Sequence, residues 1–339
     1  MTKKVNENRI KWGILGVGDV CEVKSAPAMQ IIKNSGVVAV MRRNGAKAKD
    51  YAKRHQVPKW YDRAEDLIQD PEVNAIYIAT PPNAHSELTI KAASAGKPIY
   101  VEKPMAKSFA ECKQMMAACK QAHVPLYVAY YRRMLPNFLK FKELVESGII
   151  GEIRLVKIEL YKTAEPDIVA NKEANQASNW RVNPEISGGG YFFDLASHQL
   201  DFLDFVFGPV QSVGGHAANQ AGLYPAADVV VGYFTFENNI QGVGSWCFTA
   251  DETAEKDELT VIGSKGTLST SFFGKPEISL ALSGGKENQK LSFQLPKHIQ
   301  QPLIQTVVDD LLGKGTCPST GATAIRTNWV IEEMTNRFA

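Results

Sequence analysis

Three ionisable side chains have the types and spacing needed to move a proton and to stabilise charge on an oxygen. Asp194 and His198 lie four residues apart in a segment predicted to be helical, which places them on one face of the helix. A carboxylate there can orient the imidazole and raise its basicity, so His198 is a candidate general acid or base. Lys103 follows a short apolar run, and its ammonium could polarise a carbonyl oxygen.

Each of these residues also has an alternative interpretation. An Asp–His pair on a helix is more often structural when it is taken alone, and Lys103 could be a surface lysine before a turn. Asp201 continues the same helix face, which leaves a metal site open as a further alternative. We predict no metal, because no second ligand cluster has a recognisable spacing.

A glycine-containing turn near the N-terminus has the spacing of a dinucleotide-binding site. Gly16 and Gly18 follow a predicted strand and precede a predicted helix, with Cys21 at the third position of the Gly-x-Gly-x-x-Gly pattern. The first glycine permits a tight turn, and the second lets the backbone approach a pyrophosphate at the helix N-terminus. Cys21 is small and apolar, which is tolerable there, although Gly or Ala would pack closer.

The end of the second predicted strand indicates which nucleotide is bound. A site that prefers NAD places a carboxylate about 20 residues after the glycines, where it accepts from the ribose 2′-hydroxyl. Residues 38–44 contain Arg42 and Arg43 and no acid. Two arginines could bind a 2′-phosphate, and each charge-assisted hydrogen bond contributes roughly 1.5–3 kcal/mol. The pattern favours NADP(H) over NAD(H), unless both arginines merely solvate the end of the strand.

Strands and helices alternate through the first 130 residues. We predict strands at 12–15, 37–41, 75–79, 99–101 and 126–129, and helices at 20–33, 45–55, 63–69, 84–95 and 108–122. Apolar strands separated by helix-length segments are typical of a parallel sheet that is covered on both faces. We therefore predict a Rossmann domain at 1–129, with Lys103 at the carboxyl edge of its sheet and a Lys103–Pro104 bond that could be cis.

The second half has the pattern of an antiparallel sheet. Segments 153–162, 229–236, 240–248 and 258–262 alternate or are rich in β-branched residues, and residues 237–239 have the composition of a hairpin turn. Helices are predicted at 190–206, 302–313 and 320–337. We predict a second domain over 130–339, whose last helix packs back on the first domain.

Composition and charge exclude several classes of protein. The chain has 339 residues and a net charge of +2, with its basic residues spread along it, so we expect no nucleic-acid partner. The polar N-terminus lacks the apolar core of a signal peptide, and no apolar stretch approaches the ~20 residues that span a bilayer. The five cysteines lack metal-binding spacing and are expected to be reduced thiols. We expect a cytoplasmic protein with no membrane contact.

These pieces together resemble the glucose–fructose oxidoreductase and inositol dehydrogenase family (Gfo/Idh/MocA). The matching segments occur in the family's order and, with the last helix, extend over nearly the whole chain. They are Gly16-Val17-Gly18, Ala79–His85, Ala95-Gly96-Lys97, Glu102-Lys103-Pro104, and Gly188–Gly190 with Asp194 and His198. The resemblance implies a Rossmann domain followed by an α/β domain with a large, open, mostly antiparallel sheet. Because this sheet commonly mediates oligomerisation, a homodimer or homotetramer is expected.

The resemblance also implies a role for individual residues. Lys103, Asp194 and His198 would form the catalytic group, and Glu102 would lie near the nicotinamide. The residues expected along the cofactor are Gly16, Gly18, Asp19, Val20, Arg42, Arg43, Thr80, Pro81, Asn83, His85, Glu102 and Lys103. NADP-using members typically carry a Ser-Arg pair at the end of the second strand, from which Arg42-Arg43 departs.

Weaker candidates for substrate contacts are Tyr130, Arg132, Arg133, Trp180 and Arg181. Each of them could instead pack at a domain interface or be solvated.

The resemblance thus predicts an NADP(H)-dependent oxidoreductase. It would transfer a hydride between nicotinamide and a carbonyl or secondary alcohol of a sugar, cyclitol or polyol. Two alternatives stay open, namely a catalytically silent NADP-binding regulator and an enzyme for a non-sugar carbonyl or a cyclic diol. Retention of Lys103, Asp194 and His198 together argues against the regulator.

Overall fold

Two compact units make up the protein. The computed structural model describes residues 5, 7–166, 168, 179–285 and 288–335. The first unit comprises Met1–Tyr131 and Pro296–Ile325, and the second comprises Arg132–Leu295 and Arg326–Ala339. The chain therefore passes between the units after residues 131, 295 and 325.

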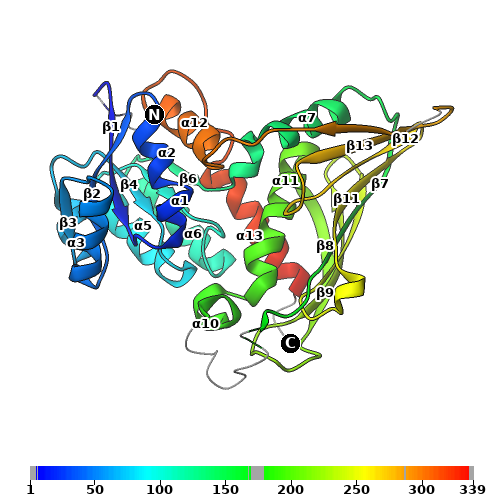
Figure 1. Ribbon diagram of the computed structural model, residues 1–339, viewed down its shortest axis with the longest axis horizontal. Helices are drawn as coiled ribbons and strands as arrows, with labels where there is room; N and C mark the ends of the chain where they lie inside the picture. Colours follow the sequence, from blue (N-terminus) through cyan, green and yellow to red (C-terminus); the bar gives the residue numbers. More distant parts are fainter. Residues whose placement is uncertain (1–4, 6, 167, 169–178, 286–287, 336–339) are drawn as a thin grey trace. The chain divides into compact units, whose positions relative to one another are not determined.

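The first unit contains a six-stranded parallel sheet in the order β3-β2-β1-β4-β5-β6 (Figure 1, blue to cyan). Its strands are β1 (Ile10–Leu15), β2 (Ser35–Met41), β3 (Lys59–Tyr61), β4 (Ala75–Ile78), β5 (Ile99–Val101) and β6 (Leu126–Val128). Every residue of β4 and β5 is buried, as expected for strands covered on both faces. This strand order is that of the Rossmann fold and confirms the predicted fold class of this half.

Seven helices described within this unit connect and cover the strands, and an eighth begins in it. They are α1 (Asp19–Val23), α2 (Ala26–Ile31), α3 (Gly45–Arg54), α4 (Ala64–Gln69), α5 (His85–Ser94), α6 (Phe109–Gln121) and α12 (Gln301–Leu311), with α13 (Gly321–Thr335) passing into the second unit. The single helix predicted at 20–33 was wrong, because Pro27 near the start of α2 cannot continue a helix from α1. Strand β3 was not predicted; it has three residues, none of them buried.

The second unit contains an eight-stranded sheet in the order β14-β13-β12-β11-β7-β10-β9-β8 (Figure 1). Its strands are β7 (Ile153–Tyr161), β8 (Val210–Ala218), β9 (Val229–Phe236), β10 (Gln241–Cys247), β11 (Lys256–Gly263), β12 (Gly266–Thr270), β13 (Glu277–Leu282) and β14 (Gln289–Ser292). Only the β7–β10 pair is parallel among these neighbours. The predicted hairpin between β9 and β10 is confirmed, with Asn239 at φ +66°.

The two faces of this sheet differ in exposure. Helix α7 (Pro136–Glu146), which was not predicted, places Phe138 4.8 Å from Phe202 of α11 (Ser197–Phe207) between ring centroids. On the same unit, Met334 of α13 closely approaches Gly232 of β9. The opposite face of β9 and β10 leaves Val231, Tyr233 and Val243 exposed.

No helix among the described residues is both long and apolar enough to cross a membrane. The last helix was predicted to extend to residue 337, and residues 336–337 lie outside the described part of the chain.

Candidate functional site

The glycine turn has the backbone geometry that a dinucleotide requires. Gly16 has φ +91°, and a Cβ on it would stand 2.6 Å from Cγ2 of Thr80, so only glycine fits without strain. A Cβ on Gly18 would meet nothing within 4 Å, which leaves open space over the backbone at the start of α1. The Cys21 side chain is fully buried, with Sγ 4.0 Å from the Gly16 carbonyl oxygen. A small apolar residue therefore fits the third position of the pattern.

The end of β2 presents two exposed arginines beside this turn. Gly16 N–H donates to the Met41 carbonyl at 2.9 Å, which joins the turn to the last residue of β2. Arg42 Nη1 donates to the Val17 carbonyl at 3.3 Å, while Arg43 is exposed. A positive charge is thereby held at the turn, where a phosphate attached to the ribose would lie.

A carboxylate that the sequence analysis did not consider reaches the same neighbourhood from β3. Oδ2 of Asp62 lies 3.5 Å from the position that a Cβ on Gly45 would occupy, at the first residue of α3. It follows β3 directly in the sequence, but β3 was not predicted. The charge at the end of β2 is thus mainly basic with one acid close to it.

The segment after β4 is tied to the loop that holds Lys103 through a buried histidine. His85 is fully buried, with Nε2 2.8 Å from the Thr80 carbonyl oxygen and Nδ1 3.1 Å from that of Pro104. Burial lowers the pKa of His85, whereas the hydrogen bonds to the Thr80 and Pro104 carbonyls act in the opposite direction. His85 therefore fixes two loops, whereas the predicted contact with the cofactor stays a prediction.

Thr80 and its neighbours leave polar groups at the same edge of the sheet. Thr80 Oγ1 is buried without a hydrogen-bond partner among the described residues. Pro81 precedes a short 3-10 turn at Pro82–Ala84, and Asn83 in the middle of this turn has an exposed side chain. A buried hydroxyl on a residue that packs against Gly16 of the glycine turn is the kind of group that a bound ligand satisfies.

Glu102 is a buried carboxylate with three donors in the first unit. Its Oε1 accepts from Tyr77 Oη at 2.6 Å and from Gln300 Nε2 at 2.8 Å, and Oε2 accepts from Lys103 N–H at 3.3 Å. Burial raises the pKa of Tyr77 well above its usual value, so its phenol stays a donor. The Lys103–Pro104 bond is cis, as predicted. Gln300, which the sequence analysis missed, fixes Glu102 and hence the backbone at Lys103.

The helix with the catalytic candidates of the second unit begins in a widened turn. Residues Phe192–Ala196 form a π-helix, and α11 follows directly, so Asp194 and His198 are not separated by one regular α-helical turn. Such widened turns occur frequently at functional sites. The preceding Gly190 has φ +74°, and a Cβ on it would be 2.4 Å from the Cβ of Ala226. The glycines therefore allow this helix start to pack against residue 226.

Asp194 and His198 each have a defined neighbour in this unit. Asp194 Oδ2 accepts from Arg181 Nε at 3.2 Å, and the Arg181 guanidinium lies 4.5 Å from the Trp180 ring centroid. His198 is 4% exposed, and its ring centroid is 6.3 Å from that of Phe273. Arg181, predicted to contact substrate, is thus also a partner of the predicted catalytic aspartate.

The two consecutive arginines after Tyr131 bind different groups within the second unit. Arg132 is 6% exposed and donates through Nε and Nη2 to the Phe272 carbonyl at 3.2 and 2.9 Å. Tyr130, which belongs to the first unit, is fully buried. The predicted substrate contacts of Arg132 and Tyr130 therefore stay predictions. The burial of both side chains does not favour such contacts.

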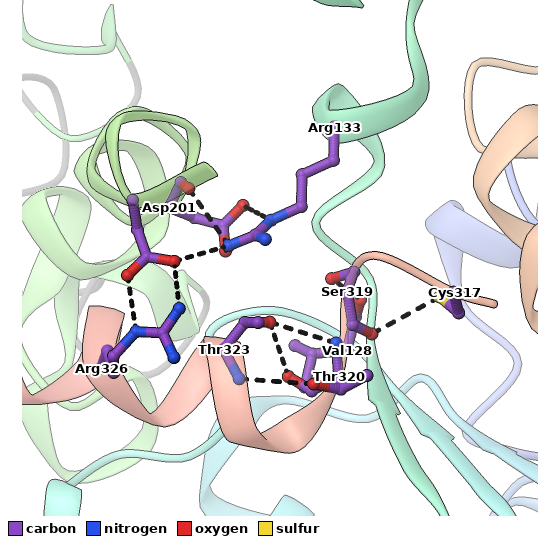
Figure 2. Close-up of polar contacts among 9 residues, drawn as sticks. Val128, Arg133, Asp201, Cys317, Ser319, Thr320, Thr323 and Arg326 are labelled. Atoms are coloured by element: carbon purple, nitrogen blue, oxygen red, sulfur yellow. Dashed lines mark hydrogen bonds and ion pairs between the residues drawn. The ribbon is translucent and has the colours of Figure 1, made fainter. Parts of the chain in front are cut away.

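Arg133 belongs to a cluster of four charges, of which all but Arg326 are buried (Figure 2). Its guanidinium makes two hydrogen bonds to the Asp201 carboxylate at 2.8 and 2.7 Å, one to the Asp201 carbonyl at 3.2 Å and one to Asp204 at 3.3 Å. Arg326 of α13 makes two bonds of 2.7 Å to Asp204. Burial raises the pKa of Asp201 to about 6, although the Arg133 guanidinium opposes that shift. Asp201 is thus paired with an arginine.

Among the described residues, no group of three or more His, Cys, Asp or Glu side chains could hold a metal ion. The metal alternative considered for Asp201 therefore has no supporting ligand set in the part of the chain that the structure describes.

Comparisons with known proteins match both halves of the chain. Residues 10–130 match the model of an oxidoreductase family with an NAD-binding Rossmann fold, and residues 138–269 match a GFO/IDH/MocA C-terminal domain. Oxidoreductase P35 of Formosa agariphila is 41% identical over 314 residues, which cover 92% of this chain and 94% of that protein. Trans-1,2-dihydrobenzene-1,2-diol dehydrogenase of Bos taurus is 26% identical over 76% of this chain and 72% of its own.

A solved structure of levoglucosan dehydrogenase in complex with NADH and levoglucosan has the same fold. Its TM-score is 0.83 at 20% identity, and the match covers 96% of each chain.

Proposed function

Because the chain belongs to the GFO/IDH/MocA family of oxidoreductases, we propose that it is an NADP(H)-dependent enzyme that interconverts a secondary alcohol and a carbonyl. The observation that carries the proposal is the arginine pair at the end of β2. Arg42 is hydrogen-bonded to the glycine turn, Arg43 is exposed next to it, and residues 38–44 contain no acid. Two cations there favour a dinucleotide with a 2′-phosphate, against which Asp62 acts by repulsion.

The first unit fits the body of such a cofactor. Gly16 permits the tight turn, and the open space at Gly18 leaves backbone N–H groups accessible to a pyrophosphate. The buried Thr80 hydroxyl supplies a further polar group at the same turn. When bound, the nicotinamide gives a hydride to the carbonyl carbon of the substrate or takes one from the alcohol carbon. Glu102, held by Tyr77 and Gln300, would contact the nicotinamide end.

The remaining chemistry is a proton transfer at the substrate oxygen. In the reduction, His198 donates a proton to that oxygen while the Lys103 ammonium stabilises the negative charge that develops on it. In the oxidation, His198 accepts the proton of the alcohol. Asp194 positions His198, and Arg181 in turn holds the Asp194 carboxylate at 3.2 Å.

The substrate class is a sugar, cyclitol or related polyol. It is supported by the likeness in fold to a levoglucosan dehydrogenase. A cyclic diol is the second candidate, because the bovine relative named for such a diol matches three quarters of the chain. We also propose that the protein is a homo-oligomer that associates through the exposed face of β9 and β10, where Val231, Tyr233 and Val243 lie. The five cysteines, all within the described residues, form no disulfide, which supports a cytoplasmic location.

Replacing Lys103 with Met tests the catalytic group. The purified protein would be supplied with NADPH and ketoses or inososes, and with NADP⁺ and inositols, levoglucosan or cyclic diols. We expect K103M to keep its cofactor affinity and to lose ~10²–10³-fold in turnover, because one charge that stabilises the oxyanion is removed. The matched control is K120M, at an exposed lysine in the last turn of α6. Unchanged turnover in K103M would contradict the proposal, and NADPH binding without any turnover would favour the regulator.

A further inference from the structure

The loop after β12 places an aromatic ring next to His198. The centroid of the Phe273 ring lies 6.3 Å from that of His198, and the two rings are inclined at 68°. Phe273 is half-buried, whereas the adjacent Phe272 is buried. We call residues 271–275 the aromatic loop. The catalytic histidine candidate therefore has a partly exposed phenylalanine as a direct neighbour in its own unit.

One carboxylate fixes the backbone of the aromatic loop. Asp257 of β11 accepts from Phe272 N–H at 3.1 Å, from Phe273 N–H at 2.6 Å and from Gly274 N–H at 3.1 Å. Charge-assisted hydrogen bonds of this kind are about twice as strong as neutral ones. The Ser271 hydroxyl also donates to the Lys275 carbonyl at 2.9 Å, which closes the turn. Phe273 thus starts from a backbone held in one conformation.

Arg132 fixes the ring itself. Its guanidinium donates to the Phe272 carbonyl through two nitrogens, and its Cζ lies 4.6 Å from the centroid of the Phe273 ring. A desolvated cation over an aromatic face is attracted by the ring more strongly than a cation exposed to water. Because Arg132 is only 6% exposed, little water competes with this contact. The ring beside His198 is therefore held in place before any ligand arrives.

We infer that Phe273 is a specificity-determining residue whose fixed ring contacts the apolar C–H face of a cyclic substrate. Asp257 and Arg132 act on it as positioning residues. A hydroxylated ring presents C–H groups on a face that can lie against an aromatic ring, while its hydroxyls need polar partners elsewhere. An open-chain polyol has no such preformed face and must order more bonds on binding. This inference rests on the proposed function and narrows its substrate class to ring compounds.

Kinetic constants of F273A and F273L measure the contribution of the ring. The probes are myo-inositol and levoglucosan as ring compounds and sorbitol as an open-chain polyol. We expect F273A to raise KM for the ring compounds by about 2–10-fold, the effect of losing roughly 0.5–1.5 kcal/mol of aromatic contact. KM of F273L for the ring compounds should lie between those of wild type and F273A. In both variants KM for sorbitol should change less than twofold, and NADPH affinity should be unchanged. An equal effect on ring and open-chain compounds would overturn the inference.

Two further variants separate specificity from stability. F109A is the matched control, because Phe109 in α6 is also a half-buried phenylalanine with a cation over its ring, Lys113 at 4.8 Å. It should leave both KM values unchanged. D257N weakens the anchor of the aromatic loop without removing the ring, and it should raise KM for the ring compounds in the same direction as F273A. A loss of thermal stability in D257N with no change in KM would refute its positioning role.

Saturation-transfer NMR with myo-inositol reads the contact without turnover. With NADP⁺-saturated protein, irradiation of aromatic protons should transfer saturation to the ring C–H protons in wild type and much less in F273A. Equal transfer in both proteins, or no binding of either ring compound to wild type, would overturn the inference. Loss of turnover with the NMR difference kept would instead refute the proposed function alone.

Discussion

Replacing Arg133 with methionine should destabilise the second unit more than the same replacement at Arg326, although both arginines bind Asp204 (Figure 2). The two sites differ in burial. The Arg133 side chain is 2% exposed and its partner Asp201 1%, whereas Arg326 is 36% exposed and binds Asp204, which is 5% exposed. R133M leaves Asp201 without this guanidinium in a buried site. R326M leaves Asp204 with its 3.3 Å contact to Arg133.

The expected magnitudes follow from that difference. Removing one partner of a buried ion pair destabilises by ~3–5 kcal/mol, because the remaining charge is uncompensated. For the partly solvated Arg326 we expect ~1–2 kcal/mol, since water screens the pair. For a domain of 150–250 residues, 1 kcal/mol shifts Tm by about 2–4 °C. R133M should therefore lower Tm by roughly 6–20 °C, and R326M by roughly 2–8 °C.

The pH dependence of the R133M defect has a defined sign. Burial already raises the pKa of Asp201 to about 6 from its usual 3.8, and loss of Arg133 raises it further. A group whose folded-state pKa is raised favours the folded state at low pH and loses that contribution as pH rises through the folded pKa. The deficit of R133M relative to wild type should therefore be larger at pH 8 than at pH 5.

Thermal unfolding by scanning calorimetry at both pH values measures these differences. Hydrogen exchange of α11 peptides, with α3 peptides as the internal reference, assigns them to the second unit. An R326M defect as large as that of R133M, or an R133M defect below ~1 kcal/mol, would refute the reasoning from burial.

Three other perturbations have outcomes that the structure predicts. G18A should keep the Tm of wild type but weaken NADPH binding at least about tenfold, because its Cβ occupies open space at the turn. G16A should weaken NADPH binding and also lower Tm, since φ +91° strains an alanine. Equal Tm values of G16A and G18A in fluorescence scans would contradict this difference. Arg54 lowers the pKa of Glu22 to about 2. This carboxylate therefore stabilises the folded state at pH values above its unfolded pKa of 4.5, and that contribution is lost as the pH falls toward 2. Because the side chain is 35% exposed, E22Q should lower stability by ~1 kcal/mol or less at pH 7, and a gap in urea midpoint that persists at pH 2 would argue against the pair. Y233E should reduce the molar mass measured by light scattering to that of a smaller species, and an unchanged mass would exclude this sheet face as the interface.

The local sequence pattern was sufficient to predict those elements whose structure restricts the residue types within the segment itself. The apolar strand β4 and the glycine turn were predicted because burial on both faces and a tight turn each restrict residue type locally. The short strand β3 and the glycine- and serine-containing strand β8 were missed, because neither has a clear hydrophobic pattern. Pairing with neighbouring strands, which the local sequence does not reveal, makes these segments strands. The break between α1 and α2 could have been found from Pro27.

The site was only partly readable from the sequence for a similar reason. Lys103, Asp194 and His198 belong to motifs, but their partners come from distant segments. Gln300 reaches Glu102 over 198 positions, and Phe273 lies beside His198 after 75 residues. A glutamine or phenylalanine carries no motif of its own, so only the fold identifies such partners.

Fluorescence titration of the purified protein with NADPH and with NADH is the most direct test of the proposed cofactor and of the oxidoreductase function. We expect NADPH to bind at least about tenfold more tightly, ~1.4 kcal/mol, and the preference to disappear in the double variant R42A/R43A. Equal or tighter binding of NADH would show that Arg42 and Arg43 do not bind a 2′-phosphate. Asp62 would then be the better candidate to bind the ribose hydroxyls of NADH. Binding of neither nucleotide would contradict the oxidoreductase function itself.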